Sequence, residues 1–105
     1  MKTHKDLDVW KKSVDFVTDL YKVTQDFPKE ELYGLTSQMR RAAISIPSNI
    51  AEGSARQGNK ELVQFLCIAL GSAVELDTQL NIARNLTYIN EEKIYSMYVK
   101  TRRNR

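Results

Sequence analysis

The sequence predicts an all-α protein, an antiparallel up-down-up-down four-helix bundle in which residues 1–105 form a single domain. Apolar residues recur with the helical period in successive segments, strand signals are almost absent, and the short connections favour antiparallel neighbours. A chain of 105 residues with 42% hydrophobic and 28% charged residues can build one modest core. A three-helix bundle with a frayed fourth element is the alternative architecture.

The first predicted helix ends before Pro28, because the proline ring and the missing amide hydrogen prevent its continuation. Two neighbouring apolar stripes run along it at helical spacing: Trp10, Val14, Val17, Tyr21 and Thr24 form one, and Val9, Phe16, Leu20, Val23 and Phe27 the other. Together they make a wide apolar face, which suits a helix that contacts more than one neighbour. A single turn is expected over residues 29–33.

The second helix is predicted to run from a cap at Thr36 or Ser37 to about Arg56, with a kink at Pro47. Pro47 has no amide hydrogen for the carbonyl of the preceding turn, so nearby donors are needed. The hydroxyls of Ser45 and Ser48 can return to carbonyls of that turn, and the amide of Asn49 can donate to a carbonyl or to a neighbouring helix. The polar residues around the proline therefore have a local structural task.

A polar stripe on the same helix comprises Arg41, Ser45, Ser48 and Glu52, at steps of four, three and four residues. Glu52 is also placed to pair with Arg56 one turn later. The stripe is either a wet groove for a ligand or the polar rim of a helix–helix or subunit contact. The contact is favoured, because no cluster of catalytic groups accompanies the stripe.

The third helix has the clearest pattern in the chain, a seam at alternating steps of four and three: Leu62, Leu66, Ala69, Ala73, Leu76, Leu80 and Ala83. It reaches roughly 40 Å, whereas a short fourth helix capped by Asn90 spans about 20 Å. The fourth helix is thus expected to cover only half of the third, and another subunit is the natural cover for the remainder.

Two residues of the third helix carry separate expectations. Cys67 lies in an apolar run, so we expect a buried, inert thiol and a reducing cytoplasm. Glu75 follows the small residues of positions 71–73, and we expect a partly buried carboxylate paired with Arg40 or Arg41, since an isolated buried charge is prohibitive. An exposed glutamate on the helix surface is the equally weighted alternative.

Composition argues against an enzyme. The single histidine, His4, lies in a polar N-terminal arm, so the paired Glu-x-x-His motifs of a di-iron bundle cannot form, and no glycine-rich phosphate loop is present. We therefore expect no catalytic residues, no cofactor and no metal. The longest nearly apolar run, residues 65–74, is too short to cross a bilayer, and nothing marks export, so no membrane partner is expected.

Net charge is +3, but the distribution of charge matters more than its total. The tail holds Lys100 and three arginines, which leaves 12 basic against 13 acidic residues in a nearly neutral body. Positions 36–60 have a local basic excess that can contact phosphate. The candidate nucleic-acid-binding residues are Arg40, Arg41, Arg56, Lys60, Arg102, Arg103 and Arg105.

Three stretches carry a family resemblance: DLDVWKKSVDFV, LYKVTQDFPKEELYGLTSQMRRAAISIPSNIAEG and FLCIALGSAVELDTQLNIARNLTYI. From about Asp6 to Ile89 the chain resembles the bacterial four-helix-bundle family of 23S rRNA intervening-sequence proteins, which is related to the accessory proteins of diversity-generating retroelements. Members usually have a longer final helix than a chain that stops after TRRNR.

The resemblance implies a cytoplasmic, non-enzymatic protein that assembles as a homopentamer. For the retroelement branch it also implies binding to nucleic acid and to a reverse transcriptase. Two hypotheses follow: an oligomeric accessory protein that binds RNA or DNA, or an oligomeric protein–protein interaction scaffold without nucleic-acid binding. For the scaffold, the candidate docking surfaces are Trp10, Tyr33 and the uncovered half of the third helix.

Overall fold

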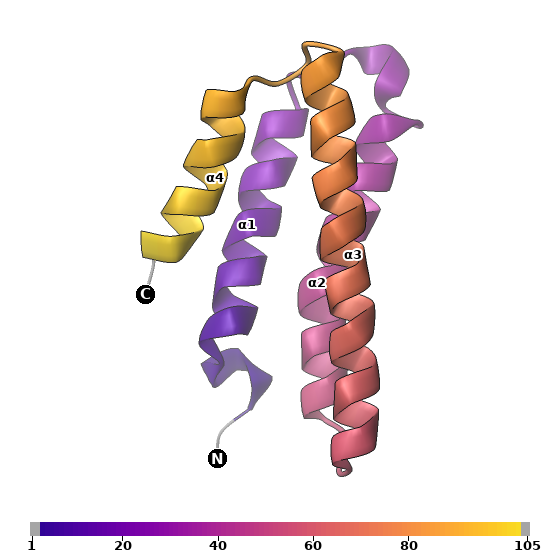
Figure 1. The fold of residues 1–105 in the computed structure, drawn as a ribbon, viewed down its shortest axis with the longest axis vertical. Helices are drawn as coiled ribbons and strands as arrows, with labels where there is room; N and C mark the ends of the chain where they lie inside the picture. The colour runs from indigo at the N-terminus through magenta and orange to yellow at the C-terminus, as the bar shows by residue number, and fades with distance from the viewer. Residues whose placement is uncertain (1–2, 104–105) are drawn as a thin grey trace.

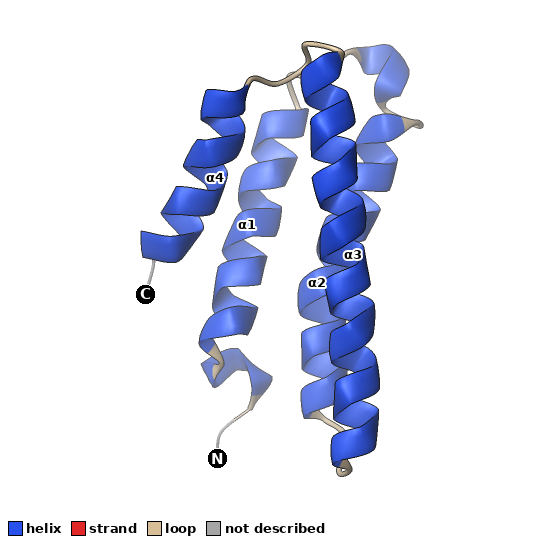
Figure 2. Ribbon diagram, viewed as in Figure 1, coloured by secondary structure: helices blue, strands red, loops and turns tan. Residues whose placement is uncertain are grey.

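The computed structural model describes residues 3–103, with side chains described as far as Lys100. Within that range every regular element is a helix (Figure 2), so the all-α prediction is confirmed. Four α-helices and two 3-10 turns follow one another in the order η1 His4–Asp6, α1 Asp8–Thr24, η2 Lys29–Glu31, α2 Leu35–Ser54, α3 Asn59–Asn85 and α4 Glu91–Arg103.

The helices form a four-helix bundle in which successive helices run in opposite directions (Figure 1). α1 packs against both α2 and α4, and α2 packs against both α1 and α3. The wide apolar face predicted for α1 is thus shared between two neighbours. α4 is shorter than α3, with 13 residues against 27, as the sequence predicts.

The position of α4 differs from the expectation that it would cover half of α3. It packs mainly on α1, where the rings of Phe16 and Tyr98 lie 5.0 Å apart and Lys100 pairs with Asp19 at 3.2 Å. α4 meets α3 near their connection, through an ion pair of 2.6 Å between Arg84 and Glu91. The broad face of α1 accepts α4 because it still has apolar surface to bury after α2 is in place.

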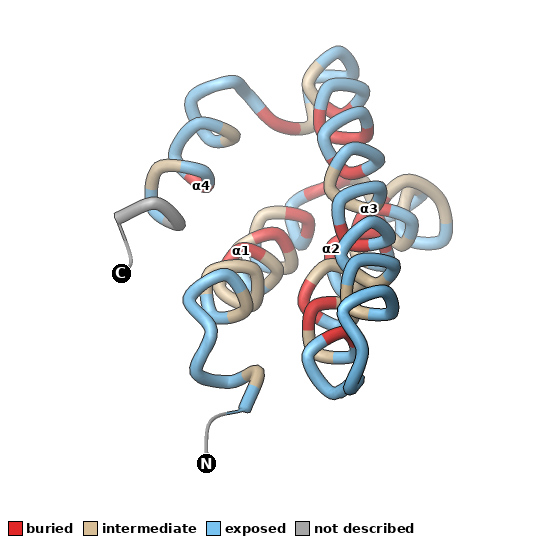
Figure 3. The backbone as a smooth tube through the Cα atoms, turned by 60° about the horizontal axis from the view of Figure 1, so that its bottom comes forward, coloured by how far each residue is buried: buried red, intermediate tan, exposed pale blue. Residues whose placement is uncertain are grey.

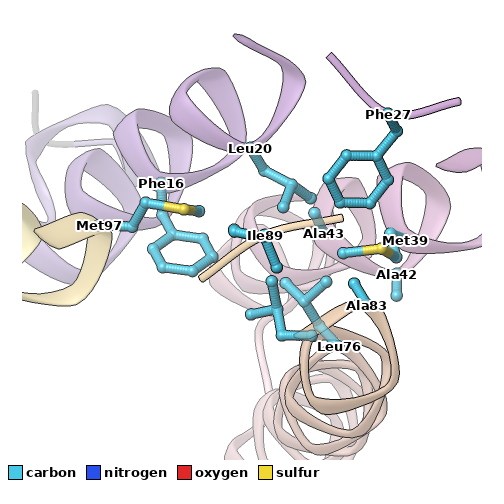
Figure 4. Packing of buried hydrophobic residues seen from close by; sticks show 11 residues of the cluster. Phe16, Leu20, Phe27, Met39, Ala42, Ala43, Leu76, Ala83, Ile89 and Met97 are labelled. Atoms are coloured by element: carbon cyan, nitrogen blue, oxygen red, sulfur yellow. The ribbon is translucent and has the colours of Figure 1, made fainter. Parts of the chain in front are cut away.

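The core lies where the C-terminal half of α3 faces α1 and α2. Leu20, Met39, Leu76 and Leu80 are its largest fully buried side chains. Figure 4 shows Leu20, Met39 and Leu76 converging with Phe27 and with others of the cluster, to which Leu80 also belongs. All four helices and both connections at that end of the bundle contribute, since Phe27 follows α1, Ile89 precedes α4 and Met97 lies in α4.

The start of α2 differs from the predicted hydroxyl cap. The helix begins at Leu35 after Gly34, Thr36 is buried, and the Ser37 hydroxyl donates back to the carbonyl of Gly34 at 3.1 Å. The backbone amide of Leu35 instead donates to a carboxylate oxygen of Glu31 at 3.3 Å. A carboxylate from the preceding turn therefore satisfies one of the free amides at this helix end.

Pro47 lies buried inside α2, which continues as α-helix on both sides of it. The amide of Asn49 donates to the carbonyl of Ser45 at 2.7 Å and to its hydroxyl at 2.9 Å, as predicted for a donor beside the proline. The hydroxyl of Ser72, on α3, is 2.8 Å from that of Ser45. The polar residues around Pro47 thus also join α2 to α3, while Ser48 is exposed.

Candidate nucleic-acid interface

A shallow groove of about 480 Å³ lies where α1, the turn after η2 and the first half of α2 meet. We call it the arginine groove, because its seven lining residues include two arginines and no carboxylate. The residues are Tyr21, Leu32, Tyr33, Ser37, Arg40, Arg41 and Ile44. Apolar and aromatic surface therefore lies directly beside positive charge.

Arg40 is held in place at the edge of this groove. Its Nε donates to the hydroxyl of Thr24 at 2.9 Å, and its Nη2 donates to the carbonyl of Tyr21 at 3.2 Å. The guanidinium also lies over the Tyr21 ring, 4.5 Å from its centroid, which adds a cation–π contact. A positive charge held this way lies ready for an anion without first losing side-chain freedom.

The other edge of the groove is open to solvent. Arg41 is exposed, and Tyr33 is 93% exposed. Leu32 and Ile44, at 44% and 43% exposure, add apolar surface to the lining of the groove. The sequence predicts Tyr33 as a docking candidate but does not predict that it lies near Arg40 and Arg41. Only the folded turn brings position 33 beside α2.

The turn that carries Tyr33 is anchored through Glu31. One oxygen of that carboxylate accepts from the Leu35 amide, and the other accepts from the Tyr88 hydroxyl at 2.9 Å. This hydrogen bond is the largest cause that raises the pKa of Tyr88, followed by desolvation and the charge of Glu31. The bond ties the connection before α2 to the connection after α3.

The remaining predicted basic residues lie elsewhere. Arg56 lies in the connection between α2 and α3, 15 residues along the chain from Arg41, and Lys60 lies in the first turn of α3. Arg56 pairs with Glu52 at 3.2 Å, as predicted, and its guanidinium lies 5.0 Å from the centroid of the Phe65 ring. The structure therefore divides the predicted set into two separate basic sites.

The three predicted tail arginines lie at or beyond the end of the described residues. The backbones of Arg102 and Arg103 lie in the last turn of α4, but their side chains, and the whole of Arg105, are outside the described residues.

The residues of the polar stripe predicted on α2 do not share one environment. Arg41, Ser48 and Glu52 are exposed, whereas Ser45 turns toward Ser72 of α3.

An outward apolar face marks the N-terminal half of α3. Val63, Leu70 and Val74 are 56%, 65% and 61% exposed, and Cys67 is exposed between them. These four residues, at steps of four, three and four, define the α3 outer face. Figure 3 shows this part of the helix largely exposed. The uncovered half of the third helix, predicted from its length, is thus present.

One prediction for α3, the burial of Cys67, is wrong, and of the two alternatives for Glu75 the structure shows the exposed one. Cys67 is exposed, because it lies on the outer face rather than on the seam against α2. Glu75 is also exposed, and it accepts a hydrogen bond from Gln79 at 3.2 Å, while Arg40 is engaged with α1. Glu75 immediately precedes the buried Leu76, so the helix turns its side chain about 100° away from the core.

The described residues contain no group of three or more His, Cys, Asp or Glu side chains that could hold a metal ion. No helix in the described range has the length and apolar character needed to cross a bilayer. The molecule is thus defined by its fold and by two exposed surfaces, the arginine groove and the α3 outer face.

These features define a class of protein: a small all-helical four-helix bundle with a basic groove and an unpaired apolar helix face. The chain belongs to the 23S rRNA-intervening sequence protein family, whose model matches residues 5–104. The resemblance read from the sequence is confirmed for this family. No curated protein matches the chain.

Proposed function

We propose that this chain is the subunit of a cytoplasmic homo-oligomer, a non-enzymatic accessory protein that binds RNA or DNA. The observation that carries the nucleic-acid part is the arginine groove, where two arginines meet apolar and aromatic surface and no lining carboxylate opposes them. The body of the chain is nearly neutral overall, so a local site of this kind is needed to attract phosphate.

Assembly is supported by the α3 outer face. A row of exposed apolar residues along one half of a helix leaves surface in water that a second copy would cover. The family resemblance favours five copies. Repetition of the groove around a closed assembly would multiply weak phosphate contacts, because each further contact becomes intramolecular once the first has formed.

Fluorescence anisotropy with a structured RNA and a matched DNA duplex at several salt concentrations tests the nucleic-acid part. We expect binding that weakens steeply with salt. Arg41→Ala should weaken binding to all sequences and reduce the slope of log affinity against log salt by about one. Lys11→Ala, which removes one exposed charge from α1, is the matched control and should leave both quantities nearly unchanged.

Absence of binding at low salt contradicts this part of the proposal. Light scattering behind a sizing column tests the assembly separately, and a monomeric mass contradicts it. Arg56→Ala and Lys60→Ala distinguish the two basic sites, since their effect should be smaller than that of Arg41→Ala if the groove is the main contact.

The second candidate function is a protein-binding scaffold. An open, mostly apolar groove of about 240 Å³ between the helices supports it, with Val9, Phe16, Ile46, Leu76 and Tyr98 among its lining residues. A partner's apolar side chain, including one from a reverse transcriptase, would fit such a groove. Trp10 is a poorer anchor than expected, because it is half-buried and packs edge-on against His4, with ring centroids 5.1 Å apart.

A further inference from the structure

We infer that the arginine groove takes unpaired nucleotides of a single-stranded nucleic acid, with a base stacked on Tyr33 and the adjoining phosphate at Arg41. This inference rests on the proposed function and adds the kind of nucleic acid recognised. Its first support is that the Tyr33 ring, at 93% exposure, buries almost nothing within its own chain. The fold gains little from an aromatic side chain at that position.

The ring is nevertheless carried by a fixed turn. The Gly34 amide donates to the carbonyl of Glu31 at 3.0 Å, and the Glu31 carboxylate joins the start of α2 to Tyr88. A tyrosine side chain has few rotatable bonds, so placing it on an anchored turn keeps the entropy lost on binding small. Tyr33 is therefore suited to be a stacking platform.

Two positive charges line the same groove as Tyr33, so a nucleotide stacked on the ring has cations available for its phosphates. Arg41 is exposed beside the groove, and Arg40 is fixed by Thr24 and by the Tyr21 carbonyl while retaining further N–H donors. The apolar side chains of Leu32 and Ile44 line the same groove as these cations. In a single strand the bases have flat, apolar faces, and the negative charge lies on the phosphates of the backbone. The groove presents the complementary features, an aromatic ring and apolar side chains beside two arginines.

The same pattern disfavours a duplex. Base faces in a double helix are stacked on one another, so a duplex can offer its phosphates to the arginines but no base face to Tyr33. An acidic peptide would satisfy the arginines and leave the aromatic surface without a matching partner. Unpaired nucleotides use every part of the groove, because bases that are splayed out stack readily on aromatic side chains.

The test measures anisotropy of a labelled, unstructured 20-nucleotide RNA, the same sequence as DNA, and the RNA in duplex form. The wild-type assembly should bind the single strands more tightly than the duplex. Tyr33→Ala should weaken single-strand binding about tenfold with little change in the salt slope, because stacking releases no counterions. Arg41→Ala should lower the slope by about one, and Tyr33→Phe should retain most of the affinity.

Tyr95→Ala is the matched control, since Tyr95 is 70% exposed on α4 and away from the groove. Its affinity should equal that of the wild type, and circular dichroism should be unchanged in every variant. Equal binding of duplex and single strand, with no loss in Tyr33→Ala, overturns the inference and leaves the proposed function standing. If no nucleic acid binds at low salt, both fail. Binding of an acidic peptide alone, lost in Tyr33→Ala, assigns the groove to a protein instead.

Discussion

The two halves of α3 differ in chemistry along one outward face. The α3 outer face is apolar from Val63 to Val74, whereas the continuation of the same face carries Asp77, Asn81 and Asn85. The inward side does not change in this way, since Ala69, Leu76, Leu80 and Ala83 are buried along both halves. The α3 outer face, with its row of exposed apolar residues, is therefore suited to bind a partner, whereas its polar continuation is an ordinary solvent-facing helix surface.

Coverage by the chain itself also differs between the halves. The C-terminal half belongs to the core cluster with Leu20 and Met39. The N-terminal half packs closely on α2, where Gly53 approaches the side chains of Leu62 and Phe65, and turns its opposite side to solvent. One end of α3 is therefore stabilised from within the chain, and the other end has one covered side and one bare side.

The largest expected effect is Leu80→Ala in the covered half. Leu80 is 1% exposed, so removing its branched end should lower the free energy of unfolding by about 2–5 kcal/mol through lost burial and a remaining cavity. Chemical denaturation measures the change. The exposed Thr78 is the matched control, and Thr78→Ala should stay within about 0.5 kcal/mol of the wild type. Equal effects of the two changes would contradict the assignment of the core.

The bare half is tested by Leu70→Glu. A carboxylate on the α3 outer face would have to be desolvated in a subunit contact, so we expect the dissociation constant of the assembly to rise by about a hundredfold or more. Light scattering and helical content are measured together, and helicity should stay unchanged. Asn81→Glu, on the polar continuation of the same face, is the control and should leave the mass unaltered. An unchanged mass in Leu70→Glu would remove the outer face as the subunit contact.

A pair of glycine changes distinguishes the two sides of the N-terminal half. A Cβ at Gly53 would lie 3.0 Å from Cβ of Phe65 and 3.1 Å from a methyl of Leu62, so Gly53→Ala should lower the unfolding free energy by about 1 kcal/mol despite the better helix propensity of alanine. Gly71, inside α3, has nothing within 4 Å of such a Cβ, and Gly71→Ala should raise stability by about 0.5–1 kcal/mol. Shifts of the same sign would refute this distinction.

The smallest expected effect concerns the approach of α4 to the polar half of α3. Burial, and secondarily the negative charge of Asp77, raises the pKa of Tyr98 above its usual value of 10.0. Because the folded-state pKa is the higher one, this contribution is present below pH 10 and is lost as the pH rises through the folded-state value. The unfolding free energy should fall more steeply above pH 10 in the wild type than in Tyr98→Phe. Parallel curves from pH 9 to 11 would contradict this.

Sequence reasoning succeeded where a residue acts along its own helix. The seam of α3 was predicted residue by residue, and Ala69, Leu76, Leu80 and Ala83 are buried. Of the other three seam residues, Leu62 and Ala73 are half-buried, and Leu66, in the bare half, is 42% exposed. The Glu52–Arg56 pair was also foreseen, because a spacing of four residues places the two side chains on one helix face.

Sequence reasoning failed where the exposure of a side chain depended on the rotation of its helix about the helix axis, and where a site needed residues from several elements. Neighbouring sequence predicted a buried Cys67 wrongly and left the burial of Glu75 open, because one residue along a helix turns a side chain by about 100°. Their exposure follows from which side of α3 faces α2. The arginine groove could not be predicted from the sequence either, because its lining residues come from α1, the turn after η2 and α2.

The sequence by itself determined the all-helical class, the four segments, the interruption before Pro28 and the apolar stripes, because these depend on local backbone geometry and a period of 3.6 residues. Only the tertiary structure decided that α4 packs on α1, which side of α3 stays bare, and that Tyr33 and the two arginines line one groove. The physical reason is that a stripe specifies which side of a helix avoids water, but several neighbours can cover it equally well, and the choice among them is made by packing of the whole chain.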